Sequence, residues 1–207
     1  MGDIKEKVWS QIFIIYTRLL IGGAFVFASI VKIKGNRFTA ESGELNPINS
    51  AWHFFETMYQ SGLYWKFIGI AQLIAGFLLM TQKYSKLGAL FNLPIILNIF
   101  IITISYYFAY TPVITGLMLL ANLLLIIWEW DEIKILFNLT PTLDKRMRLE
   151  KDYIWQVIGL ILFSFIFAFG LFFHEHNFGF WIIACFLIAI LGLILGILRE
   201  KKRKNYI

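Results

Sequence analysis

The sequence has little cysteine, little histidine and few charged residues. Its one cysteine, Cys185, cannot form an intramolecular disulfide, and no second thiol exists for a dithiol relay or a cysteine-rich metal site. Charged residues make up 15% of the 207 residues, against roughly 25% in soluble domains. Hydrophobic residues make up 59%, against roughly 45–50% in soluble domains. This composition excludes an ordinary soluble domain.

The sequence also lacks the common catalytic motifs. It contains no GxSxG nucleophile motif, no Walker-type glycine loop and no HExxH zinc motif. None of its three histidines lies within a long apolar run, which argues against haem held by two histidines. Whether the protein is an enzyme therefore stays open, and the one enzymatic role we consider is that of a membrane oxidoreductase subunit.

Six long apolar runs are present, and they predict membrane-spanning helices. A transmembrane helix needs about 20 mostly apolar residues, whereas barrel strands are shorter and alternate in hydropathy. The predicted spans are residues 8–31, 63–81, 87–108, 113–128, 153–173 and 178–198. The first run is longer than the roughly 7–15 apolar residues of a signal peptide and contains Arg18, so we expect a retained span. The predicted fold is an all-α integral membrane protein with six transmembrane helices.

Lysine and arginine lie mainly on one side of these spans. Of the 19 cations, 14 precede the first span, follow the sixth, or lie in the second–third and fourth–fifth connections. By the positive-inside rule this face is cytoplasmic, which predicts a multi-pass protein of the inner (cytoplasmic) membrane with both termini in the cytoplasm. Because the cations flank apolar runs, we expect the lipid bilayer as partner, with a protein partner subunit left open, and no nucleic acid.

The connections predict how the spans are grouped. Short turns favour packing of the second, third and fourth spans together, and of the fifth with the sixth. In the longer outer connection, Asn46 and Pro47 suit a helix start, and Ile48, Trp52, Phe55 and Tyr59 share one helical face. We expect an amphipathic helix at about 47–61 on the outer interface or capping the bundle. The chain should divide into a four-helix core (1–137) and an inner connection with a two-helix hairpin (138–207).

Several polar residues lie where lipid would surround them. They are Arg18, Gln72, Asn98 and Asn122 in the first four spans, and Glu129 at the inner end of the fourth. A charge within the membrane costs at least about 2.5–3.5 kcal/mol and usually faces a bundle interior or a cavity. Arg18 has two interpretations. It could bind an anionic or quinone-like ligand or serve a proton path, or it could pair with Glu129 and bond Asn98 or Asn122.

Two further patterns give weaker signals. Pro94 lies one turn before Asn98, and a kink there could open a cavity beside Asn98. His174, Glu175 and His176 could ligate zinc or copper, although a polar turn is the simpler interpretation. We therefore expect no metal.

Short patterns in the first four spans resemble the DoxX-like membrane family (DoxX, DoxD and MauE-like proteins). The matching segments are RLLIG at 18–22, ASIVK at 28–32, SGLY at 61–64, IGIAQL at 68–73, LGA at 87–89, LPI at 93–95, TP at 111–112 and LLANL at 119–123. The resemblance covers residues 8–137 and leaves residues 150–207 as an added hairpin. It implies a four-helix membrane core, often coupled to redox or sulfur chemistry through partner proteins.

Carried over position by position, the resemblance singles out Arg18, Lys32, Gln72 and Asn122. With Asn98 and Glu129 they form our candidate set for a polar intramembrane pocket. The leading hypothesis is an accessory or binding subunit whose pocket takes a quinone-like or lipid-like ligand. A small transporter or channel is the alternative, and it would need a continuous polar path.

Overall fold

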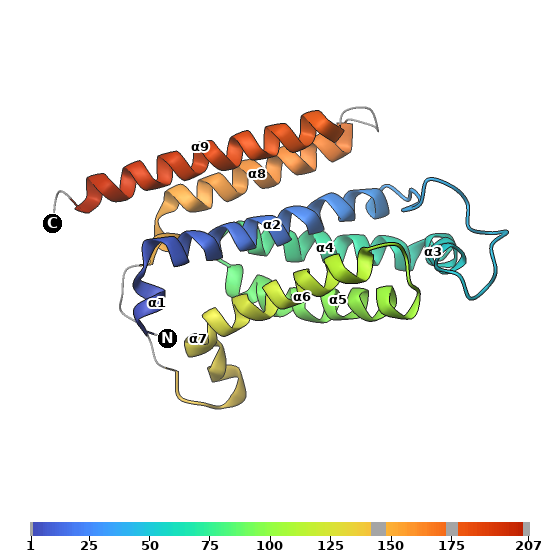
Figure 1. Ribbon diagram of the computed structural model, residues 1–207, viewed down its shortest axis with the longest axis horizontal. Helices are drawn as coiled ribbons and strands as arrows, with labels where there is room; N and C mark the ends of the chain where they lie inside the picture. Colours follow the sequence, from blue (N-terminus) through green and yellow to red (C-terminus); the bar gives the residue numbers. More distant parts are fainter. Residues whose placement is uncertain (1, 142–147, 173–177, 205–207) are drawn as a thin grey trace.

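The structure, a computed structural model, describes residues 2–141, 148–172 and 178–204, and these residues form helices and turns without a strand. Six helices are long and apolar enough to cross a membrane (Figure 1). They are α2 (Val8–Ile33), α4 (Leu63–Met80), α5 (Ser85–Ser105), α6 (Thr111–Trp128), α8 (Tyr153–Phe172) and α9 (Phe178–Lys204). The shorter elements are α1 (Gly2–Glu6), α3 (Ala51–Gln60), α7 (Trp130–Ile133) and the 3-10 turns η1 (Lys134–Phe137) and η2 (Leu149–Lys151). The predicted all-α polytopic architecture is confirmed.

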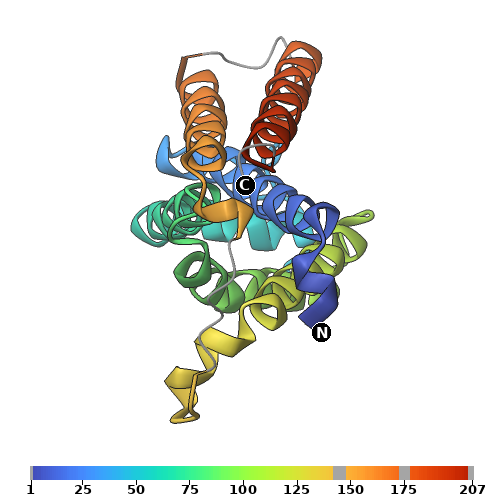
Figure 2. The same cartoon turned by 90° about the vertical axis from the view of Figure 1, so that its left-hand side faces the viewer.

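Helix α2 lies at the centre of the bundle. The α8–α9 hairpin lies on one side of it and α5 with α6 on the other, as the end-on view shows (Figure 2). Of the residues in the apolar stretch of α2 that could cross the membrane, 61% are buried. The corresponding share for α9 is 11%. The bundle has two ends. We call the end that holds the start of α2 and the finish of α9 the terminal end, and the opposite one the α3 end.

Glycines allow α2 and α4 to pack closely. A Cβ at Gly76 would stand 2.7 Å from the backbone oxygen of Gly22, and one at Gly69 would stand 3.0 Å from the backbone oxygen of Ser29. Small residues at such crossings let membrane helices approach through their backbones. The contact of α2 with α4 is the most extensive between any two of the described helices.

The predicted neighbours pack as expected, and the hairpin also packs on the core. Helix α4 contacts α5, α5 contacts α6, and α8 contacts α9, while α8 also packs along α2. At the α3 end, Lys34 Nζ donates to the carbonyl oxygens of Gly170 (2.7 Å) and Leu171 (2.8 Å). Tyr16 on α2 donates its hydroxyl hydrogen to the Ala189 carbonyl of α9 at 2.6 Å. The hairpin is therefore fastened to α2 by polar contacts as well as by apolar packing.

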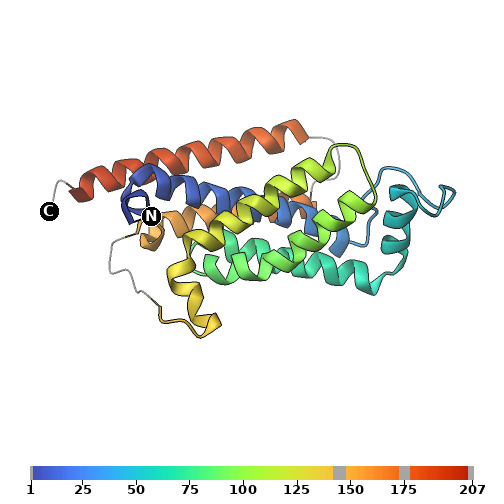
Figure 3. The ribbon, with the colours of Figure 1, turned by 60° about the horizontal axis from the view of Figure 1, so that its bottom comes forward.

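The amphipathic helix of the outer connection is present, but it is shorter than predicted. It starts at Ala51 instead of residue 47, because the Ser50 hydroxyl, rather than Asn46, caps it by accepting from the His53 N–H at 3.2 Å. Helix α3 lies across the end of the bundle (Figure 3). Its Trp52 and Phe55 rings contact Phe108, so it caps the bundle.

An arginine clamp holds the connection before α3. Arg37 Nε donates to Glu56 Oε2 at 2.9 Å and Arg37 Nη2 donates to Glu56 Oε1 at 3.0 Å. The Gly43 N–H also donates to Glu56 Oε2 at 3.2 Å. Hydrogen bonds from Arg37 lower the pKa of Glu56, so this carboxylate is ionised and fully engaged.

The close helix crossing gives a first testable prediction. Gly76→Ala should destabilise the protein by about 1–3 kcal/mol, since the added methyl group meets the α2 backbone. Thermal unfolding of the detergent-solubilised protein measures the effect. Gly179→Ala is the matched control, because a Cβ at Gly179 has nothing within 4 Å. Equal unfolding temperatures for the two variants would contradict the close packing.

Candidate functional site

At the terminal end, Arg18 is bound on several sides although only 1% of it is exposed. Its Nη2 donates to Glu129 Oε1 at 2.6 Å, and its Nη1 donates to Glu150 Oε2 at 2.6 Å and to Gln82 Oε1 at 3.1 Å. Glu129 follows α6, Gln82 lies in the α4–α5 turn, and Glu150 belongs to η2. Arg18 therefore joins three separate parts of the chain to α2.

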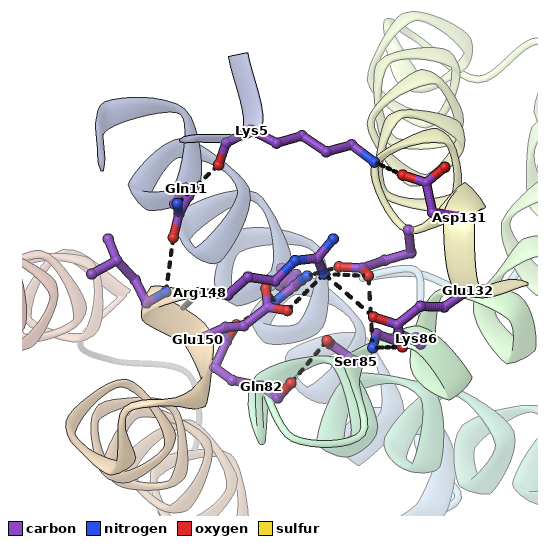
Figure 4. A network of polar contacts seen from close by, with 12 residues as sticks. Lys5, Gln11, Gln82, Ser85, Lys86, Asp131, Glu132, Arg148 and Glu150 are labelled. Carbon is purple, nitrogen blue, oxygen red and sulfur yellow. Dashed lines mark hydrogen bonds and ion pairs between the residues drawn. The ribbon is translucent and has the colours of Figure 1, made fainter. Parts of the chain in front are cut away.

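A second arginine completes this four-charge network of Arg18, Glu129, Arg148 and Glu150. Arg148 Nη1 donates to Glu129 Oε2 at 2.7 Å and to Glu150 Oε1 at 3.1 Å (Figure 4). Two cations thus share two carboxylates, and the network is neutral. Burial raises the pKa of Glu150, but the charges of Arg18 and Arg148 outweigh it and leave the pKa of this carboxyl below its usual range.

Further polar contacts surround the network. Lys86 binds Glu132, and Lys5 Nζ donates to Asp131 Oδ2 at 2.7 Å (Figure 4). Gln11 Oε1 accepts from the Leu149 N–H at 2.8 Å and so holds η2 against α2. These contacts surround the network, in which both terminal nitrogens of Arg18 already donate to oxygens of the protein.

The structural interpretation of Arg18 is correct in part. The ion pair with Glu129 is confirmed, whereas the expected hydrogen bonds to Asn98 or Asn122 are wrong. Asn122 lies seven residues before Glu129, about 10 Å along the helix at 1.5 Å per residue. It accepts instead from Asn92 Nδ2 at 3.0 Å and donates its own Nδ2–H to the Ala89 carbonyl at 3.0 Å.

Four partners of Arg18, Glu129 or Asn122 were not predicted from the sequence: Gln82, Asn92, Arg148 and Glu150. Arg148 and Glu150 lie in a connection of mixed charge, where nothing in the spacing distinguishes them from solvated residues. Asn92 precedes Pro94 in the third span and carried the same signal as Asn98, a polar residue within an apolar run.

The α3 end holds a cavity of about 550 Å³, within the range of roughly 300–1,000 Å³ that small-molecule sites occupy. Residues from α2, α3, α4, α5 and α6 line it, and most of them are apolar or aromatic. Three of the predicted site residues are among them: Lys32, Gln72 and Asn98. The other three, Arg18, Asn122 and Glu129, do not line it. The six residues therefore do not form one pocket: three line the cavity, Arg18 and Glu129 belong to the four-charge network, and Asn122 pairs with Asn92.

Lys32 lies on the cavity wall and is 7% exposed. Its Nζ donates to the Ala28 carbonyl at 2.9 Å and lies 5.4 Å and 5.1 Å from the ring centroids of Phe38 and Trp65. Such distances fit cation–π interactions. Trp65 is itself held in place, because its indole N–H donates to the Asn36 carbonyl at 2.9 Å.

Two amide side chains complete the polar lining. Gln72 is 3% exposed, and its Oε1 has no hydrogen-bond partner among the described residues. Asn98 is exposed on α5, one turn after Pro94, and both line the cavity. The cavity expected beside Asn98 is therefore present.

The possible metal ligands His174, Glu175 and His176 lie outside the described residues. Within the described ranges, no group of three His, Cys, Asp or Glu side chains could hold a metal ion.

Comparisons with known proteins add no relative. No family model matches the chain, and neither a curated protein nor a solved structure matches it.

Removing one member of the four-charge network should destabilise the fold. Arg18→Met leaves Glu129 and Glu150 to share one arginine, and breaking a buried pair in this way costs about 3–5 kcal/mol. We expect a lower unfolding temperature than for Lys201→Met, which removes an exposed cation near the same end. Adding Glu129→Gln to Arg18→Met restores neutrality and should recover part of the loss. Equal stability of the two single variants would contradict the structural role of Arg18.

The network also predicts a pH dependence. The pKa of Glu150 is lower in the folded protein than in the unfolded chain, where it is about 4.3. The ionised carboxylate therefore contributes its full stabilisation above about pH 4.3, and this contribution is lost as the pH falls through the pKa of the folded state. The difference in unfolding temperature between wild type and Glu150→Gln should be constant from pH 7 to about pH 5 and shrink at lower pH. A difference that grows on acidification would contradict this assignment.

Proposed function

We propose that this protein binds a lipid-like amphipathic molecule in the cavity at the α3 end, as an accessory or binding subunit of the membrane. The observation that carries the proposal is an apolar cavity of ligand size whose wall contains Gln72 Oε1, a buried acceptor without a partner in the described part of the chain. A buried polar atom left unbonded costs about 1–3 kcal/mol. A ligand that supplies a hydrogen-bond donor there, on itself or through a water that it holds in place, would recover this cost.

The shape and the lining favour a long apolar molecule with a small polar group. At about 30 Å³ per water-sized group, 550 Å³ holds on the order of 18 such groups. That is the size of one long alkyl chain or of a short-chain quinone. Lys32, Gln72 and Asn98 would meet the polar group, while rings such as Phe67 and Phe108 would meet the chain.

We also propose that the first four spans form a DoxX-like core of an inner-membrane protein with both termini in the cytoplasm, linked to redox or sulfur metabolism through a partner subunit. The support is the set of sequence patterns, together with the burial of all four positions singled out by the resemblance: Arg18, Lys32, Gln72 and Asn122. The lysines and arginines of the terminal end support its cytoplasmic orientation.

The alternative of a transporter or channel has less support. Between the cavity and the four-charge network, Ile21, Ala75 and Leu79 belong to one buried apolar cluster with residues of α5 and α6. Packed apolar side chains, together with the buried and mutually bonded pair of Asn92 and Asn122, lie between the polar groups of the two ends.

Ligand binding can be measured by quenching of tryptophan fluorescence, because Trp65 lines the cavity. The probes are decylubiquinone and two brominated C-eighteen amphiphiles, dibromostearyl alcohol and dibromostearic acid. We expect saturable quenching by at least one of them. Ala71→Phe, which fills the cavity, should weaken that binding at least tenfold, whereas Ala168→Phe, at an exposed position on α8, should not. Absence of saturable quenching by all three probes, or unchanged binding in Ala71→Phe, would refute the proposed function.

A further inference from the structure

Two cations are buried in the spanning helices of the described chain, and their surroundings differ. Arg18 has carboxylate oxygens of two glutamates at 2.6 Å. Lys32 has no carboxylate of the described residues within ion-pair distance, and its one hydrogen bond goes to the Ala28 carbonyl. Since an ammonium carries three donors, two of those on Lys32 lack an acceptor among these residues.

The composition of the cavity walls explains why no protein acid reaches Lys32. Helices α2, α4, α5 and α6 contain no aspartate or glutamate. Helix α3 contains one, Glu56, whose two oxygens are taken by Arg37 and the Gly43 N–H. The residues that line the cavity therefore include the cation Lys32 and no aspartate or glutamate.

Lys32 does not extend toward the end of its helix, as a lysine near a membrane surface usually does. Its amine turns back one turn to the Ala28 carbonyl and lies between the rings of Phe38 and Trp65. Ala28, Phe38 and Trp65 all line the cavity. At the stem, the backbone of Gly69 packs so closely that a Cβ there would stand 2.8 Å from Lys32 Cβ. The amine is thus held at the cavity wall.

We infer that the ligand of this cavity is a single-chain amphiphile with an anionic oxygen head group, a carboxylate or a phosphate, and that Lys32 is its counter-ion. The inference rests on the proposed function and narrows its ligand from lipid-like molecules in general to acidic ones. An anionic head group supplies the acceptors that Lys32 lacks and cancels the cost of a buried charge. A neutral quinone offers carbonyl acceptors but no charge.

The test compares an acid with a neutral molecule of the same chain. Full-length protein in uncharged detergent is titrated at pH 7.5 with dibromostearic acid and with dibromostearyl alcohol, and quenching of tryptophan fluorescence gives the two dissociation constants. We expect the acid to bind at least tenfold more tightly than the alcohol. This comparison uses wild-type protein and does not depend on the folding of any variant.

Variants then locate the charge. Lys32→Met should weaken binding of the acid at least tenfold and leave that of the alcohol within about threefold. Lys32→Arg should retain the preference for the acid. Lys66→Met removes an exposed lysine of α4 near the same end and is the matched control, for which we expect no change. Displacement of the bound acid by oleate or by oleoyl lysophosphatidate then distinguishes a carboxylate from a phosphate as the preferred head group.

The outcomes show whether the acidic head group, the proposed binding function or both are refuted. If alcohol or decylubiquinone binds as tightly as the acid, and Lys32→Met changes nothing, the charged head group is refuted while the proposed binding function stands. If none of the probes binds, both proposals fail. If preference for the acid is lost in Lys66→Met as well as in Lys32→Met, the effect is one of general surface charge and the role of Lys32 is refuted.

Discussion

The ion pair of Arg18 with Glu129 is the interaction on which the rest of the structure depends. A guanidinium ten residues inside the first span can be tolerated there only if carboxylates are brought to it. One comes from the end of α6 and another, Glu150, from the segment before α8. Meeting this requirement fixes the position of the fourth span and brings the hairpin against the central helix. Lys34 repeats the fastening at the opposite end by binding the last carbonyls of α8.

The two ends of the bundle therefore differ in how their charges are satisfied. At the terminal end, two arginines and two glutamates neutralise one another, and this closed arrangement suits a structural role. At the α3 end, Lys32 and Gln72 line an apolar cavity without equivalent partners among the described residues. Glu56 lies on α3, which also lines the cavity. Its carboxylate is bound by Arg37, so it does not neutralise the charge of Lys32. This contrast favours a ligand-binding role for the α3 end and a stabilising role for the terminal end.

Much of the fold could be predicted from the sequence because lipid imposes strong rules on span length and hydropathy. The ion pair of Arg18 with Glu129 was predictable as well, because both are costly in lipid and because the start of α2 and the end of α6 lie at the same end of the bundle. The partners Arg148 and Glu150 were not, since charged residues in a connection have no pattern that tells a buried position from a solvated one. Asn46-Pro47 is a common start signal and predicts a helix from residue 47, whereas the Ser50 hydroxyl provides the actual cap. The separation of Lys32 from Arg18 was predictable too, because fourteen residues of one helix span about 21 Å at 1.5 Å per residue.

The most direct test of this division is a high-resolution map of the protein in lipid nanodiscs prepared with native membrane lipids. We expect elongated density in the cavity at the α3 end, with its head group within hydrogen-bond distance of Lys32 Nζ, and Arg18 bound by Glu129 and Glu150 without intervening density. A cavity filled by protein side chains, with Lys32 paired to a carboxylate of the chain, would contradict it.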